Sequence, residues 1–235
     1  MNGYSVLAKY YDRLMSGYDY DGVIAAVIPF CKGKGLDLGT GTGEAAIRLS
    51  MAGHAVTAVD ISAENLNIAQ RKAREKGQKI IFVEGDLAEA EFGDGFGFVT
   101  AMCDVFNYIT DRKVLKRVFK KVYDALLPGG VFFFDVSAPE KLMATVSEKE
   151  FFEDYDDVTY IWNNSEEDGV IDMELTFFVK EGDLYRRFDE FHSLRAYSEA
   201  ELSEMLRAVG FEGVECRESG EEPMNRRLFF KAVKA

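Results

Sequence analysis

Leu36-Asp37-Leu38-Gly39-Thr40-Gly41-Thr42-Gly43-Glu44 is the stretch that decides the fold. A short apolar run leads into a glycine-rich turn, and a helical pattern begins directly behind it. Glycine is required where the backbone turns tightly and approaches a ligand, because a side chain would stand in the way. The stretch therefore predicts a strand, a ligand-binding turn and the start of a helix.

Outward from this turn, apolar runs alternate with amphipathic stretches from about residue 34 to residue 136. The predicted strands are 36–38, 55–60, 79–83, 96–102 and 131–136, and the predicted helices are 43–52, 63–77 and 111–127. After Ser198 the pattern returns, with a helix that ends near Gly210 and strands at 211–216 and 228–233. Strands separated by helices favour a parallel sheet with right-handed crossovers. The sequence predicts an α/β fold with a Rossmann-like, doubly wound, seven-stranded sheet.

Segment 138–197 shows strand patterns with no helical pattern between them. Apolar and polar residues alternate over 171–179 and 184–192, and the turn sequence Glu181-Gly182-Asp183 joins these two runs. Residues 158–162 predict a third strand. We expect a small antiparallel β subdomain at 138–197, inserted into a main domain that 1–137 and 198–235 form together.

The charge of the chain argues against nucleic acid as a partner. It has 41 acidic and 28 basic residues, a net charge of −13, whereas binding to phosphates needs a basic stripe. The basic cluster within 113–121 has helical spacing and predicts a solvated helix face. The three cysteines, Cys31, Cys103 and Cys216, are widely spaced, so neither a disulfide framework nor a metal site is expected. With no signal-like start and no apolar run of about 20 residues, we expect a cytoplasmic protein without a membrane partner.

Three acidic residues lie at or near the C-terminal ends of three successive predicted strands. Asp37 can hold the α-ammonium group of a methionine moiety, whereas a dinucleotide would bring its pyrophosphate close to this charge. Asp60 can accept both hydroxyls of a ribose, as an acid in NAD sites also does. Asp86 can accept a hydrogen bond from an adenine amino group. Each acid alone could equally be a cap or a turn residue, but the carboxyl ends of such strands converge on one ligand crevice.

With these residues the chain resembles the class I S-adenosylmethionine-dependent methyltransferases over nearly its whole length. The motif Asp37-x-Gly39-x-Gly41-x-Gly43 is followed by Asp60 and Gly85-Asp86 in the order of that family. The chain is similar to a bacterial small-molecule branch that includes sugar N-methyltransferases, which carry an N-terminal Tyr-Asp lid, here Tyr11-Asp12, and an antiparallel insertion. The resemblance implies that Tyr11 closes over the cofactor. The expected S-adenosylmethionine-binding residues are Tyr11, Asp37, Gly39, Thr40, Gly41, Asp60, Ile61, Asp86, Leu87 and Cys103.

Methyl transfer from a sulfonium is an in-line displacement, so the enzyme mostly aligns the reactants, and a base helps where the nucleophile arrives protonated. His192 is the candidate catalytic base, because it lies where the inserted hairpin returns to the main domain, a segment that lines the acceptor pocket in related enzymes. A hydrogen-bonded strand histidine is the equally open alternative. Cys103 is expected to offer backbone contacts rather than thiol chemistry. The candidate substrate-binding residues are Asn107, Tyr108, Arg195 and Tyr197.

Two other functions stay open from the sequence. Gly41, Gly43 and Ala46 also fit the G-x-G-x-x-A pattern of an NAD(P)-dependent reductase, which would leave Asp37 and Asp86 unexplained. A non-catalytic S-adenosylmethionine-binding protein would keep the same glycine and acidic motifs. The sequence does not identify the small-molecule acceptor. The many aromatic residues of the insertion fit an apolar pocket, but a subdomain core or a homodimer surface is the favoured interpretation.

Overall fold

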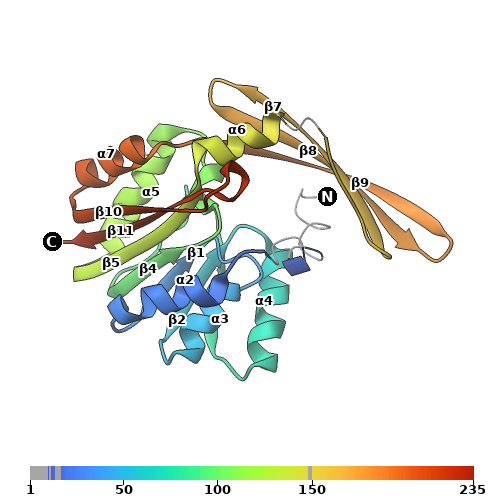
Figure 1. The fold of residues 1–235 in the computed structure, drawn as a ribbon. Coiled ribbons are helices and arrows are strands. Elements are labelled where there is room, and N and C mark those ends of the chain that lie inside the picture. The colour runs from blue at the N-terminus through green and yellow to red at the C-terminus, as the bar shows by residue number, and fades with distance from the viewer. Residues whose placement is uncertain (1–9, 11, 14–16, 148–149) are drawn as a thin grey trace.

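The computed structural model describes residues 10, 12–13, 17–147 and 150–235, and these form two sheets (Figure 1). The larger sheet has seven strands in the order β10-β11-β5-β4-β1-β2-β3. Its strands are β1 (Gly35–Leu38), β2 (Val56–Asp60), β3 (Ile80–Glu84), β4 (Phe96–Ala101), β5 (Leu126–Ser137), β10 (Phe211–Ser219) and β11 (Arg227–Lys234). Strands β3, β2, β1, β4 and β5 are parallel, and β11 runs antiparallel to both β5 and β10.

Helices cover both faces of this sheet (Figure 1). One face carries α2 (Tyr20–Val27), α3 (Glu44–Met51) and α4 (Ala63–Glu75), and the other carries α5 (Arg112–Ala125) and α7 (Glu199–Val209). The described residues also include three short 3-10 helices, η1 (Ile28–Phe30), η2 (Val105–Tyr108) and η3 (Pro223–Asn225). Helix α7 begins with the expected capping box, in which Ser198 and Glu201 satisfy each other's backbone groups. The prediction of a doubly wound α/β fold is confirmed.

The second sheet has four antiparallel strands in the order β6-β7-β8-β9. These are β6 (Glu150–Asp154), β7 (Val158–Glu167), β8 (Val170–Glu181) and β9 (Leu184–Arg195). The expectation of a helix-free segment is wrong, because α6 (Pro139–Ser147) precedes β6 and lies between the two sheets (Figure 1). Leu142 and Val146, one helical turn apart, pack on Ile171 and Leu194. Two packed positions in a nine-residue helix, with apolar Met143 and Ala144 between them, give no periodic signal that can be detected.

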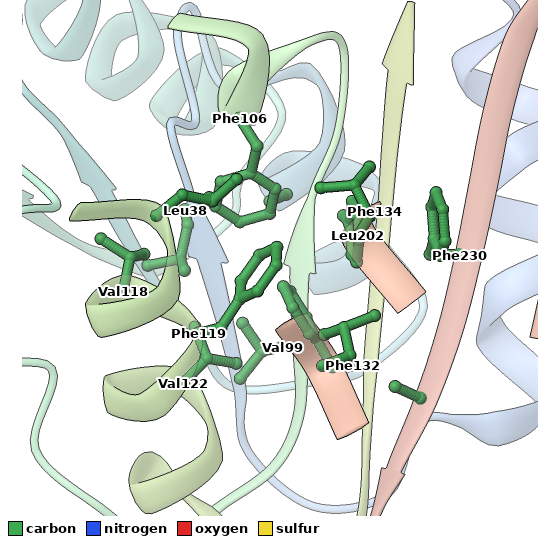
Figure 2. Close-up of a cluster of buried hydrophobic side chains, with 14 of the residues drawn as sticks. Leu38, Val99, Phe106, Val118, Phe119, Val122, Phe132, Phe134, Leu202 and Phe230 are labelled. Atoms are coloured by element: carbon green, nitrogen blue, oxygen red, sulfur yellow. The ribbon is translucent and has the colours of Figure 1, made fainter. Parts of the chain in front are cut away.

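Aromatic rings fill the core between the larger sheet and α5 (Figure 2). Phe106 in η2 is fully buried, and its ring centroid lies 5.2 Å from Phe119 and 5.1 Å from Phe134 in edge-to-face contacts. Leu115, Val118, Phe119 and Val122 share the buried face of α5, as their helical spacing requires. The turn after β4 is thus anchored in the core through Phe106.

The inner face of the inserted sheet packs against the start of the chain. Tyr10 is buried in a cluster with Val158, Tyr160, Leu175 and Phe177, so several aromatic residues of the insertion belong to its core. Others are exposed on the opposite side, among them Phe152 and Phe191. The insertion therefore covers the side chain of Tyr10.

Candidate active site

The glycine-rich turn after β1 combines tight packing with an open backbone. A Cβ on Gly39 (φ +60°) would come within 2.6 Å of the Val105 side chain, so this position excludes any larger residue. A Cβ on Gly41 (φ +54°) would meet nothing within 4 Å and would instead fill the space above the turn. Bare backbone facing open space is what a ligand needs for close approach.

Asp60, at the end of β2, ties this turn in place. Its Oδ2 accepts a hydrogen bond from Gly41 N at 2.7 Å, and its Oδ1 accepts one from Ser62 N at 2.9 Å. The side chain is buried, and burial raises the pKa of the carboxyl group despite these two hydrogen bonds. Asn65 Nδ2 also donates to Oδ1, at 3.5 Å, so it is Oδ2 that retains a lone pair for a further donor, such as a ribose hydroxyl.

Asp37, inside β1, is almost completely buried. Thr40 Oγ1 donates to its Oδ2 and Thr100 Oγ1 donates to its Oδ1, both at 2.6 Å. Burial raises the pKa of Asp37 to about 6, against the lowering effect of the two hydroxyls, and the charge of Asp60 adds to the rise. Among the described residues neither Asp37 nor Asp60 forms an ion pair with a basic side chain. The site therefore suits a ligand that brings positive charge, as a sulfonium with an α-ammonium group does.

The loops after β2 and β3 form the rest of the crevice. Ile61 is 54% exposed directly after Asp60, an apolar surface next to the carboxylate that suits a flat base. Asp86 is exposed and its Oδ1 accepts from Ala88 N at 2.8 Å, so it shapes its own turn, and its contact with adenine stays a prediction. The Leu87 carbonyl is held by Lys121 Nζ at 3.2 Å.

The carboxyl end of β4 lies in an unusual backbone conformation. Cys103 and Asp104 both have positive φ, +71° and +69°. Cys103 N donates to Asp135 Oδ1 at 2.7 Å, and Asp104 pairs with Arg227 at 2.7 Å. Tyr18 Oη donates to the same Asp135 oxygen at 2.9 Å.

Tyr18, Asp135 and Arg227 were not among the predicted site residues. One signal was available for Asp135, which is an acidic residue inside the apolar run of β5. The sequence gives no local signal for the other two.

Tyr20 is a further aromatic residue of this region. Burial raises the pKa of its hydroxyl, and Cys103 and Asp37 are among the groups that add to the rise. Its ring centroid lies 4.5 Å from that of Tyr18. Tyr20, the first residue of α2, and Tyr18, two residues before it, thus bring two tyrosines to the end of the crevice where β1 and β4 meet.

The predicted substrate-binding residues Asn107 and Tyr197 are buried and make structural contacts. Asn107 Nδ2 donates to the Arg195 carbonyl at 2.8 Å, and Ser137 N donates to Asn107 Oδ1 at 3.0 Å. Tyr197 Oη donates to the Ile109 carbonyl at 2.5 Å. These bonds fix the return of the insertion to η2, and a role of either residue toward an acceptor stays a prediction.

His192 lies on the inner side of β9, close to the turn after β4. Its Nε2 is 3.4 Å from Glu190 Oε2, and both side chains are only 3% exposed. The ring of Tyr108, a residue that is 41% exposed, stands edge-to-face to His192 with centroids 5.9 Å apart. A carboxylate, an imidazole and a phenol from two distant segments therefore meet at one place. Arg195 is near as well, with its Nη1 3.4 Å from the Thr110 carbonyl.

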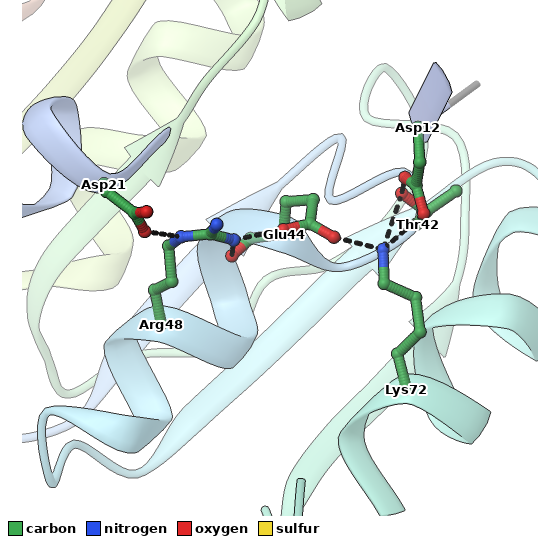
Figure 3. A network of polar contacts seen from close by, with 6 residues as sticks. All are labelled: Asp12, Asp21, Thr42, Glu44, Arg48 and Lys72. Atoms are coloured by element: carbon green, nitrogen blue, oxygen red, sulfur yellow. Dashed lines mark hydrogen bonds and ion pairs between the residues drawn. The ribbon is translucent and has the colours of Figure 1, made fainter. Parts of the chain in front are cut away.

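The proposed lid residue Tyr11 lies outside the described residues. Its neighbour Asp12 contacts the glycine-rich turn, because Thr42 Oγ1 donates to Oδ1 at 2.5 Å and Lys72 Nζ donates to Oδ2 at 2.7 Å (Figure 3). Lys72 also pairs with Glu44, the first residue of α3. Arg13, in turn, pairs with Asp157 of the insertion at 2.8 Å. The start of the chain is therefore bound to both the cofactor turn and the insertion.

In the described part of the chain, no group of three or more His, Cys, Asp or Glu side chains could hold a metal ion. None of the described helices has the length and apolar character needed to cross a membrane.

Fold and site together define a class I S-adenosylmethionine-dependent methyltransferase, and comparison with known proteins agrees. A family model described as a methyltransferase domain matches residues 36–130. The protein YqeM of Bacillus subtilis (strain 168), which is named as a methyltransferase, is 38% identical over 99% of this chain and 97% of its own length. The crystal structure of an S-adenosylmethionine-dependent methyltransferase from Clostridium acetobutylicum ATCC 824 superposes with a TM-score of 0.86 at 32% identity, over 99% of both chains. The chain belongs to the S-adenosylmethionine-dependent methyltransferases.

This membership sets the reductase and the non-catalytic alternatives aside, since the chain is an enzyme that uses S-adenosylmethionine as methyl donor. The sugar N-methyltransferase KedS8 from Streptoalloteichus sp ATCC 53650 has a TM-score of 0.73 at 18% identity, over 95% of this chain and 92% of its own. That likeness concerns the fold alone.

Proposed function

We propose that the enzyme methylates a nitrogen or oxygen atom of a small molecule bound between the turn after β4 and the inner face of the insertion, with His192 as general base. The observation that carries this proposal is the buried pair of Glu190 and His192 beside Tyr108. Two ionisable side chains at 3% exposure are costly in an otherwise apolar sheet face unless they serve a function.

S-adenosylmethionine, when bound, supplies a methyl group on a positively charged sulfur. Asp37 would accept hydrogen bonds from its ammonium group, and Asp60 from its ribose hydroxyls, while the main chain of Cys103 would lie against the methionine portion. His192 would take the proton from the acceptor, and the Glu190 carboxylate would stabilise the imidazolium that results. The insertion would cover the bound acceptor, limit the access of water and help to hold the nucleophile in line with the methyl group.

Amino sugars are the first acceptors to test, since the fold is shared with the sugar N-methyltransferase KedS8 over 95% of this chain. No disulfide joins the three cysteines, all of which are among the described residues, and this supports a cytoplasmic location.

The experiment is a transfer assay with methyl-labelled S-adenosylmethionine and a panel of amino sugars, other amines and phenols. With the acceptor found, His192→Gln should lower kcat by about 10²- to 10⁴-fold at an unchanged Kd for S-adenosylmethionine. His54→Gln is the matched control, because His54 is partly exposed and lies outside the insertion, with its Nδ1 3.3 Å from the Gly33 carbonyl oxygen and its ring against Phe98. Transfer by His192→Gln at the wild-type rate would remove His192 from the chemistry, and transfer to a carbon acceptor alone would refute the proposed target atoms.

A further inference from the structure

The turn after β4 holds two successive residues in the left-handed region, Cys103 at φ +71° and Asp104 at φ +69°. This region is unfavourable for a residue with a Cβ, although aspartate tolerates it better than most. Such conformations persist only where the surroundings impose them, and they cluster at functional sites. The turn stands at the carboxyl end of a central strand, where doubly wound sheets bind their ligands.

Asp135 holds the first residue of this turn. The residue is wholly buried on β5, and its Oδ1 accepts from Cys103 N at 2.7 Å and from Tyr18 Oη at 2.9 Å. This bond fixes the peptide plane that precedes Cys103, whereas the side chain of the next residue, Asp104, is held separately by Arg227, so the two contacts together constrain the φ of Cys103 that lies between them.

Arg227 holds the second residue. It lies on β11, next to β5 in the sheet, and its Nε donates to Asp135 Oδ2 at 2.7 Å. Its Nη2 pairs with Asp104 Oδ1 at 2.7 Å. One guanidinium therefore bridges the carboxylate of Asp135 on β5 and the carboxylate of Asp104 in the turn. Arginine is suited to this because its several N–H donors lie in a fixed planar arrangement.

The packing around Asp135 does not by itself require a charged side chain. The neighbours of Asp135 along β5 are Phe134 and Val136, both buried in the aromatic core. Burial raises the pKa of Asp135, whereas the charge of Arg227 opposes this rise. Buried ion pairs contribute little net stability compared with well-packed apolar side chains, so what this pair adds is a specific geometry.

We propose that Asp135 and Arg227 are positioning residues of the donor site, which hold Cys103 in its left-handed conformation so that the main chain of the turn faces the methionine portion of S-adenosylmethionine. The same carboxylate holds the hydroxyl of Tyr18 at this end of the crevice. The inference rests on the proposed contact between Cys103 and the cofactor.

The test measures S-adenosylmethionine binding by calorimetry in the full-length protein and in Asp135→Asn. The amide has nearly the same shape, but it cannot accept from Cys103, Tyr18 and Arg227 at once without turning its own N–H groups toward a donor. We expect the Kd to rise by about tenfold or more, and tenfold corresponds to about 1.4 kcal/mol.

A second substitution, at Cys103, tests whether the lost affinity comes from the backbone conformation of this residue or from another effect of Asp135→Asn. Glycine adopts the left-handed region without penalty, so Asp135→Asn combined with Cys103→Gly should recover most of the lost affinity. Asp135→Asn combined with Cys103→Ala removes the thiol equally but keeps the Cβ, and it should recover none. Should Asp135→Asn fail to fold, Arg227→Lys takes its place, because an ammonium cannot join both carboxylates in the same way.

The outcomes are distinguishable. Failure of the wild-type protein to bind S-adenosylmethionine would contradict the proposed function itself. Wild-type affinity in folded Asp135→Asn would overturn the positioning role, and so would equal recovery by Cys103→Gly and Cys103→Ala. A lower Kd with glycine than with alanine, in the Asp135→Asn background, would support it.

Discussion

Replacing Asp37 by Asn should stabilise the protein while weakening its binding of S-adenosylmethionine. Asp37 is 1% exposed, and its partners are two threonine hydroxyls rather than a basic residue. Burial raises its pKa from 3.8 to about 6, which means that the charged form is less favourable in the folded protein than in the unfolded chain by about 3 kcal/mol. The amide of Asn carries no charge, and the hydroxyls of Thr40 and Thr100 can rotate to donate to it or to accept from it.

The sign of the pH dependence follows from the raised pKa. Because the folded protein binds this proton more tightly than the unfolded chain, the free energy of unfolding falls as the pH rises from 3.8 to about 6. Above about pH 6 the Asp37 carboxylate is charged in the folded protein, and the free energy of unfolding is lowered by the whole cost of burying that charge. Below pH 3.8 the carboxyl group is neutral in both the folded and the unfolded protein. Asp37→Asn should therefore gain about 1–3 kcal/mol at pH 7.5, or roughly 2–10 °C in melting temperature for a chain of this size, and nothing below pH 3.8.

The same substitution, Asp37→Asn, should weaken the binding of S-adenosylmethionine although it stabilises the folded protein. A charge-assisted hydrogen bond contributes about 1.5–3 kcal/mol, so the Kd for S-adenosylmethionine should rise by about 10- to 100-fold at pH 7.5. Melting curves at pH 7.5 and at the lowest pH at which the protein stays folded, together with calorimetric titrations, measure both effects. Asp94→Asn is the control, because Asp94 is exposed and distant from the crevice. A variant less stable than wild type at pH 7.5, or one equally stabilised at both pH values, would refute the reasoning.

Two further substitutions test the core and the start of the chain. Phe106→Ala removes a fully buried ring from the aromatic core and should lower the free energy of unfolding by about 3–5 kcal/mol in urea titrations. A loss no larger than that of Phe152→Ala, at a side chain that is 65% exposed, would contradict this assignment. Lys72→Met breaks the ion pair with Asp12, which is partly exposed, so the Kd for S-adenosylmethionine should rise about two- to fivefold by calorimetry. Lys72→Arg should preserve binding, and unchanged affinity in Lys72→Met would show that Asp12 does not need this partner.

The main domain could be predicted because its signals are local. The glycine-rich turn, the helical spacing of α5 and the capping box of α7 are each contained within a few residues. The parallel order of neighbouring strands then brings Asp37 and Asp60 to one edge of the sheet, where the structure has them linked through the glycine-rich turn. Helix α6 was missed because Leu142, Met143 and Ala144 are consecutive apolar residues, so that the pair Leu142 and Val146 does not stand out as a helical period.

The interactions behind the turn after β4 depend on contacts between distant segments. Arg227 reaches Asp135 across 92 positions, and Cys103 reaches it across 32. Only the antiparallel pairing of β11 with β5 brings the guanidinium to this carboxylate. No pattern of local spacing encodes that register, so the sequence could indicate only that Asp135 interrupts an apolar strand.

Asp37 and Asp135 illustrate how partners distinguish two buried carboxylates that look alike in the sequence. Each is an acidic residue in an apolar strand of the same sheet, and each is at most 1% exposed. Asp135 has the guanidinium of Arg227, which it shares with Asp104, at 2.6 Å, so a basic partner from the protein already occupies one side of its carboxylate. Asp37 forms no ion pair with any basic residue in the described ranges, and its two hydroxyl partners leave the negative charge in place. We therefore expect a cationic ligand to gain more at Asp37 than at Asp135, which agrees with the proposed binding role of the first carboxylate and the proposed positioning role of the second.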